Sequence, residues 1–195
     1  MRTSFVALPL TLALALLPSA LPAAEDLKAR EEAALKVSDQ LLATMKEALT
    51  KELAAGGPVT SIKACSQVAP DLAGKLSREK GWKITRIGTR VRNPMLGTPD
   101  AWEQQVLSQF ADRLKKGEKL ETLTFSEKVQ EPAGSYFRTM KAIGLAPQCI
   151  VCHGSSTEVA EPIQAMLKEQ YPHDQAIGYR PGELRGAVSI KQPLP

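Results

Sequence analysis

Apolar positions near the N-terminus recur with the spacing of an amphipathic helix. Between residues 27 and 53, apolar side chains stand four residues apart, with lysine and glutamate between them. They are Val37, Leu41, Met45 and Leu49. Gly56-Gly57-Pro58 is expected to end this helix, because glycine caps helix C-termini and proline cannot continue a helix. A second helix is predicted from Pro58 to Gly81, with Cys65 near its apolar face.

The rest of the chain mixes helical segments with segments whose side chains alternate as in strands. The expected strands are Lys83–Arg92, Leu120–Val129, Ser135–Ile143 and Leu184–Ile190, the middle two joined by a turn at Glu131–Gly134. Two more helices are expected, one opened by Thr98-Pro99-Asp100 and reaching Lys115, the other over Thr157–Gln170. Helices that precede and interrupt antiparallel strands indicate the α+β class, here with a long N-terminal helix.

Residues 1–24 have the layout of a secretory signal. Met1-Arg2 is positively charged, residues 5–17 are largely apolar, and residues 18–24 end in small side chains, with cleavage expected near Ala23 or Ala24. An uncleaved membrane anchor is the alternative, but spanning a bilayer takes roughly 20 apolar residues. We therefore expect export to the periplasm and a single domain over residues 25–195.

The composition of the chain limits the classes of partner it could bind, and its cysteine count leaves one thiol unexplained. The formal net charge is only +4 over 195 residues, which does not indicate nucleic-acid binding. Aromatic residues make up 5%, so the core has room for a flat apolar cofactor. Exported proteins usually pair their cysteines in disulfides. This chain has three cysteines, so at least one thiol cannot be paired within the chain.

Cys149-Ile150-Val151-Cys152-His153 is the C-x-x-C-H signature of covalent haem attachment. Each thiol adds to one of two vinyl groups on the same porphyrin edge, and two intervening residues suit the separation of those groups. His153 follows directly, so its imidazole can reach the iron. We therefore predict one covalent haem c, held by Cys149 and Cys152, with His153 as the proximal axial ligand.

Three alternatives to haem remain for this motif. A thioredoxin-like pair normally opens a helix after a strand in a βαβ unit, whereas this motif follows a loop. A zinc site needs four ligands and would use nearly all of the three cysteines and two histidines. A disulfide between Cys149 and Cys152 is the third alternative.

Around the motif, several short segments occur in an order that is specific to one family. They are Cys65–Pro70, Arg92–Pro94, Asp100–Glu103, Phe137–Lys141, Cys149–Gly154, Tyr171-Pro172, Gly178-Tyr179 and Arg185–Ala187. Together they resemble a bacterial and cyanobacterial family of haem-c proteins with a PAS-like fold, long catalogued as a domain of unknown function. The resemblance runs from about Cys65 to Ile190.

This resemblance implies a PAS-like antiparallel sheet flanked by helices and a role as a redox or small-gas sensor. It also implies that Cys65, in the segment Cys-x-x-x-Ala-Pro, supplies an axial thiolate opposite His153. In some family members the domain precedes a signalling module. This chain ends at Pro195, just after the last expected strand, so we expect its signal to pass to a separate protein.

Several polar side chains are candidates for the haem pocket. Arg92, on which the family match falls, could bind a propionate, and Arg138 and Tyr136 are further pocket candidates. Arg86 and Arg90 lie on the same expected strand face as Arg92, and either could also bind a propionate, but both are interpreted as part of a solvated sheet face.

Three classes of function follow: a haem-based sensor, a small periplasmic electron-transfer cytochrome, and an enzyme such as a peroxidase. An electron carrier would use a methionine as the second ligand, but Met140 and Met166 fit core positions. A peroxidase needs an acid–base residue beside an open site, and the spare histidine, His173, lies in a polar segment. Catalysis is therefore the least favoured class, and a redox partner or signalling protein is the expected partner.

Overall fold

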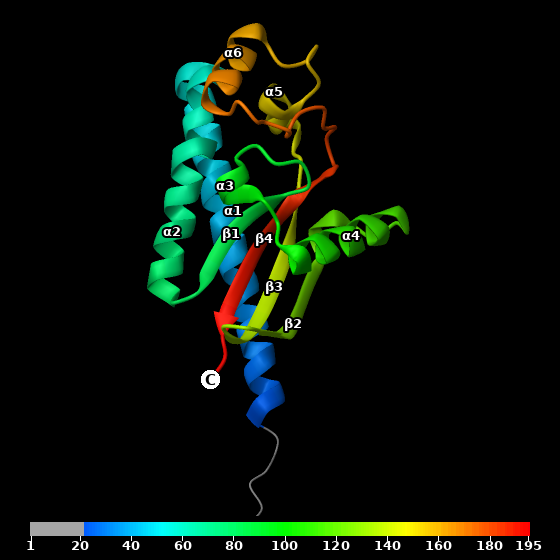
Figure 1. Ribbon diagram of the computed structural model, residues 1–195. Helices are drawn as coiled ribbons and strands as arrows, with labels where there is room; N and C mark the ends of the chain where they lie inside the picture. Colours follow the sequence, from blue (N-terminus) through cyan, green and yellow to red (C-terminus); the bar gives the residue numbers. More distant parts are fainter. Residues whose placement is uncertain (1–21) are drawn as a thin grey trace, which may run out of the picture.

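The computed structural model describes residues 22–195 and contains a four-stranded antiparallel sheet (Figure 1). The strand order is β1-β4-β3-β2. The strands are β1 (Lys83–Gly88), β2 (Thr124–Glu131), β3 (Gly134–Gly144) and β4 (Leu184–Pro193). Residues 1–21, which hold most of the predicted secretory signal, lie outside the described residues. The expectation of an α+β fold with an antiparallel sheet, flanking helices and a long N-terminal helix is confirmed.

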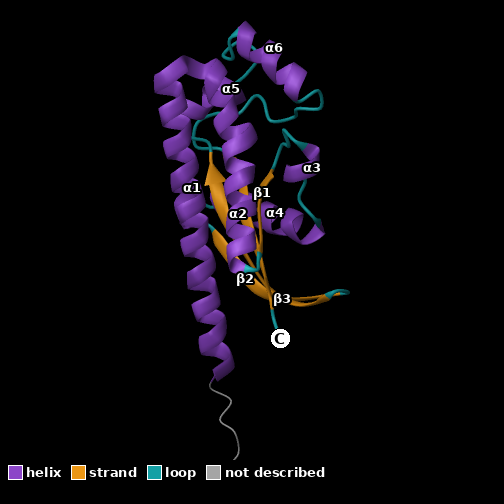
Figure 2. Cartoon of the chain, turned by 90° about the vertical axis from the view of Figure 1, so that its left-hand side faces the viewer, coloured by secondary structure: helices purple, strands orange, loops and turns teal. Residues whose placement is uncertain are grey.

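A hairpin of long helices covers one face of the sheet (Figure 2). It consists of α1 (Pro22–Lys63), the π-helical turn η1 (Ala64–Val68) and α2 (Ala69–Lys80). Leu41 of α1 and Leu76 of α2 pack with Val188 and Ile190 of β4 in one apolar cluster. The helix α4 (Ala101–Lys115) covers the opposite face, so the sheet is buried on both sides.

The helical hairpin turns at a kink inside α1, where glycine and proline predict it. Gly57 leaves the helical region with φ 73° and ψ −167°, which kinks the chain directly before Pro58. Further on, Pro70 has no N–H to donate to the carbonyl of Ser66, and its ring would crowd that carbonyl in a regular α-helix. The wider π-helical turn η1 lies directly before it and includes Cys65. Gly81 ends α2 in the left-handed conformation, as expected.

Several predicted boundaries are wrong. The strand expected from Leu120 begins at Thr124, because Leu120–Thr122 forms a 3-10 helix. The helix expected from Thr157 begins at Glu161. β1 ends at Gly88 instead of continuing to Arg92, because the next residues bond to the loop before β4 rather than to a strand. Arg90 donates its backbone N–H to the hydroxyl of Tyr179, and the carbonyl of Val91 accepts from the backbone N–H of Gln175. α4 begins at Ala101, since Asp100 rather than Thr98 is its N-cap and forms a capping box with Glu103.

Five short elements complete the described chain: α3 (Pro94–Gly97), η2 (Leu120–Thr122), η3 (Pro147–Cys149), α5 (Ile150–His153) and α6 (Glu161–Gln170). The last three, which lie between β3 and β4 in the sequence, gather at one end of the sheet, at the top of Figure 1. α6 packs through Ile163 and Leu167 against Ile62 of α1, so this end of the sheet is closed by the helical hairpin. No helix within residues 22–195 is both long and apolar enough to cross a membrane.

Candidate functional site

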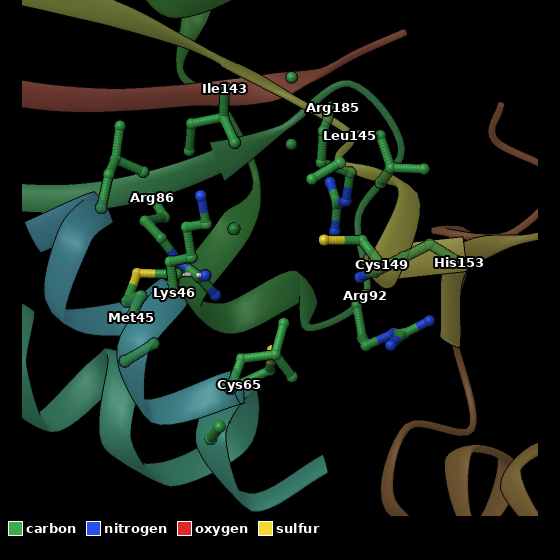
Figure 3. A pocket seen from close by; sticks show the side chains of 18 of the residues that line it. Met45, Lys46, Cys65, Arg86, Arg92, Ile143, Leu145, Cys149, His153 and Arg185 are labelled. Carbon is green, nitrogen blue, oxygen red and sulfur yellow. Dashed lines mark hydrogen bonds between the residues drawn. The ribbon is translucent and has the colours of Figure 1, made fainter. Parts of the chain in front are cut away.

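A cavity of about 1190 Å³ lies between the helical hairpin, one end of the sheet and the C-x-x-C-H segment (Figure 3). It is larger than most small-molecule pockets, which occupy roughly 300–1,000 Å³. Its walls are mainly apolar, with Leu42, Ile62, Ile84 and Ile143 among the lining side chains. The cavity therefore has the size and the polarity that a large, flat, mostly apolar cofactor requires.

Four residues predicted as iron ligands or attachment points line this one cavity. Cys149, Cys152 and His153 enter from η3 and α5, and Cys65 enters from η1. The fold thus brings together two segments that are far apart in the sequence. Burial raises the pKa of Cys149 and raises that of Cys152 to about 11. This is the opposite of the activated thiolate of a thioredoxin-like pair.

The remaining alternatives for the motif also lack support in the geometry. All three cysteines are unbonded, so Cys149 and Cys152 do not form a disulfide. Within residues 22–195, no three His, Cys, Asp or Glu side chains converge in an arrangement suited to a metal ion. A zinc site would need such a cluster.

His153 is held in the state that a metal ligand needs. Its Nδ1 lies 2.6 Å from the carbonyl oxygen of Ala176, and because a carbonyl can only accept, Nδ1 carries the proton. Burial, with the positive charges of Arg92 and Arg185, holds the pKa of His153 well below its usual value. The ring is therefore neutral and its Nε2 is left with a free lone pair.

Arg92 fixes the backbone of this segment. Its guanidinium donates to the carbonyl oxygen of Cys152 at 2.6 Å and to the carboxylate of Asp174 at 2.9 Å. Tyr179 donates its backbone N–H to the carbonyl of His153 at 2.9 Å. Its hydroxyl bonds to Thr89 at 2.8 Å, as expected for a packed tyrosine. Arg92 lines the cavity as predicted, but its hydrogen bonds go to the protein, so it positions the segment.

The structure does not support Arg138 and Tyr136 as pocket residues. Arg138 is 3% exposed and lies on the α4 face of the sheet, where it pairs with Asp100 at 2.7 Å and Glu103 at 3.2 Å. Tyr136 lies near the β2–β3 turn, with the ammonium of Lys191 4.0 Å from its ring centre. Neither lines the cavity. Alternation along β3, which puts Arg138 on the same face as buried Met140, was the signal against this prediction.

Sequence reasoning missed other cavity residues. Arg86 was interpreted as part of a solvated face, yet it lines the cavity, and burial lowers its pKa. Arg185 and Met45 line it too, whereas Arg90 lies outside and donates to the carbonyl of Ile177. Met45 was assigned to the apolar stripe of α1, and only the tertiary fold shows that this stripe borders a cavity rather than packed side chains.

The other candidate ligands are remote from the site. Met140 is fully buried in the core under α4, and Met166 packs against α1 in a separate cluster. His173 is exposed in the loop after α6. None of the three lines the cavity.

A family model described as Tll0287-like matches residues 21–193. The chain belongs to the Tll0287-like family. The match spans both the helical hairpin that carries Cys65 and the C-x-x-C-H segment, so it includes every wall of the cavity.

The fold of this Tll0287-like chain is similar to the crystal structure of the cyanobacterial heme-protein Tll0287. The TM-score is 0.65 at 22% sequence identity, and the match covers 84% of this chain and 94% of the other. At this identity the likeness establishes the fold. No curated protein sequence matches the chain.

Proposed function

We propose that the chain is an exported c-type haem protein with one haem attached to Cys149 and Cys152 and with His153 as an axial ligand. The observation that carries the proposal is the hydrogen bond from Nδ1 of His153 to Ala176, which leaves Nε2 free beside two thiols in a large apolar cavity. The family match and the haem bound by the similar cyanobacterial protein support it. One-electron exchange and small-gas binding are the chemistry that such a group supplies.

The residues around the motif have distinct tasks in this proposal. Arg92 and Tyr179 hold the backbone of the attachment segment, so the thiols and the imidazole keep a fixed mutual orientation. The bond to Ala176 selects the tautomer of His153 and makes the ring a better electron donor. The apolar walls exclude water from the iron, which influences its reduction potential.

We further propose that the role is redox or small-gas sensing, with Cys65 as the second axial ligand. Cys65 is half-buried on a π-helical turn, a distortion that is frequent at functional sites. A thiolate favours oxidised iron, so Cys65 is expected to leave on reduction, which provides the two states that a switch requires. The signal would pass to a separate periplasmic protein.

An electron-transfer role is the second candidate, because Met45 also lines the cavity. A methionine ligand raises the reduction potential and is common in cytochromes that carry electrons. The sulfur of Met45 lies 3.5 Å from a nitrogen of Arg86, on the side of the cavity away from Cys149. Identifying the second ligand therefore separates the two roles.

The mature protein is expected to carry the mass of one haem after denaturation. Expression beside haem-maturation machinery provides the wild type, and Cys152→Ala should lose most of the retained haem because one of two covalent bonds is removed. Denaturing mass spectrometry measures this. Cys65→Ala is the matched control, since it removes the third cavity thiol without touching the attachment. An intact wild type with free thiols at Cys149 and Cys152 would overturn the haem assignment.

His153→Ala is expected to shift the Soret band strongly, whereas His173→Ala leaves it at the wild-type position. The reason is that His153 lines the cavity, while His173 is exposed outside it. Absorption spectra of the oxidised and reduced proteins make the comparison. A shifted band in His173→Ala with an unchanged band in His153→Ala would reverse the assignment.

A further inference from the structure

More cationic side chains line the cavity than carboxylates pair with them. Two of its cations are paired, Arg92 with Asp174 at 2.9 Å and Lys141 with Asp39. Within residues 22–195, no carboxylate forms an ion pair with the other three cations lining it. These are Lys46, Arg86 and Arg185. The remaining acidic side chain in the wall, Glu121, is exposed.

Arg86 is the cation whose position most needs an anion. It comes from the middle of β1, and its one described side-chain hydrogen bond goes to a weak acceptor, Sδ of Met45, at 3.5 Å. The side chain is half-buried, and this burial lowers the pKa of the guanidinium. A desolvated charge without a partner is costly, so the site is suited to a ligand that brings negative charge.

The placement of Arg86 matches the chemistry of a covalently attached porphyrin. The thioether bonds form on the edge that carried the vinyl groups, and the two propionates extend from the opposite edge. Figure 3 shows Arg86, Lys46 and Met45 on the side of the cavity across from Cys149 and His153. Arg185 lies at the attachment end instead, where it donates to the carbonyl of Arg90 at 2.9 Å.

We propose that Arg86 binds a propionate of the porphyrin, with the ammonium of Lys46 at the rim as a second cation. This proposal rests on the haem assignment above. A guanidinium can hold a carboxylate through two parallel hydrogen bonds, which fixes its direction as well as its charge. Arg86 thereby sets how the ring lies between its thioether bonds and β1, and it places a positive charge near the iron.

The test compares three variants of the loaded protein, made with haem whose propionate carboxyl carbons are labelled with carbon-13. Arg86→Gln removes the proposed partner, Arg86→Lys keeps the charge but loses the paired geometry, and Arg78→Gln is the control. Arg78 is an exposed arginine of α2, so its replacement removes the same charge outside the cavity. Infrared difference spectra report the labelled carboxylates, and potentiometric titration reports the midpoint potential.

In Arg86→Gln, the labelled carboxylate band is expected to shift and the midpoint potential to fall. Losing a nearby positive charge favours ferric iron, by about tenfold in the ferric-to-ferrous ratio, or about 59 mV for a one-electron couple. Arg86→Lys should shift the band with a smaller fall in potential, and Arg78→Gln should match the wild type. The carbon label separates a propionate from any free anion in the cavity.

Two results would overturn the proposal, and they are distinguishable. If the wild type carries covalent haem but Arg86→Gln and Arg86→Lys keep its labelled band and potential, the propionate anchor is wrong and the haem assignment stands. If the wild type carries no covalent haem, both fail together. Should Arg86→Gln not accumulate as folded protein, Arg86→Lys decides alone, because a lysine cannot reproduce the two parallel bonds to a carboxylate.

Discussion

Cys65→Ser is expected to abolish the low-spin electron paramagnetic resonance signal of the ferric wild-type protein. The hydroxyl of serine is a far weaker iron ligand than a thiolate, so the iron should become partly high-spin or acquire a different sixth ligand. Removing an anionic ligand also destabilises ferric iron, and the midpoint potential should therefore rise. Spectra of the ferric protein at low temperature and a redox titration measure the two effects.

Ser66→Ala is the matched control for this experiment. Ser66 lies next to Cys65 on the same π-helical turn and lines the same cavity, so its replacement tests the turn without touching the thiol. If Cys65→Ser and wild type have the same low-spin signal, Cys65 is not a ligand. Met45→Leu would then be the next variant, because a changed signal there would support the electron-transfer role.

Gly186→Ala is expected to destabilise the protein by more than about 4 kcal/mol, beyond what most single substitutions cost. Gly186 has φ +155°, and an added Cβ would lie 1.9 Å from the carbonyl oxygen of Ile87 and 2.9 Å from the Cα of Gly88. Both are backbone atoms of β1, so no side-chain rotation can relieve the clash. The variant must separate β1 from β4, and β1 carries Arg86 into the cavity.

Gly117→Ala provides the comparison for Gly186→Ala. Gly117 also has a positive φ, of +89°, but nothing lies within 4 Å of the position of its added Cβ. Its replacement should cost only the backbone strain, about 1 kcal/mol. Urea unfolding followed by circular dichroism yields both free energies. Equal losses in the two variants would show that the close approach of the strands at Gly186 is not the decisive feature.

Much of the fold follows from local signals that the sequence displays directly. Gly57 kinks α1 and Gly81 ends α2 where their backbone freedom predicts it. The turn that joins β2 to β3 also lies where the sequence predicts it. The C-x-x-C-H motif is equally local, so the roles of its three residues could be predicted without a structure. Cys65 could be proposed as a ligand only through the family resemblance.

The missed features depend on contacts between distant segments. The early end of β1 follows from the loop after α6, which bonds to Arg90 and Val91 in place of a neighbouring strand. Arg86 faces a cavity because the helical hairpin stands away from the sheet at that end, and alternation along a strand cannot distinguish a cavity from solvent. Arg138 was misplaced for the converse reason, since its acidic partners come from α4 and β2.

The helical hairpin and the C-x-x-C-H segment lie at opposite ends of the sequence yet share one cavity. In the proposed coordination by Cys65 and His153, the iron would be a cross-link that closes a loop of about 90 residues. A cross-link of that length stabilises a fold by about 4–5 kcal/mol in the chain-entropy model. Release of Cys65 on reduction would open this loop. The oxidation state of the iron would then control how tightly the N-terminal hairpin is fastened to the sheet, and a partner protein could detect that loosening without contacting the haem.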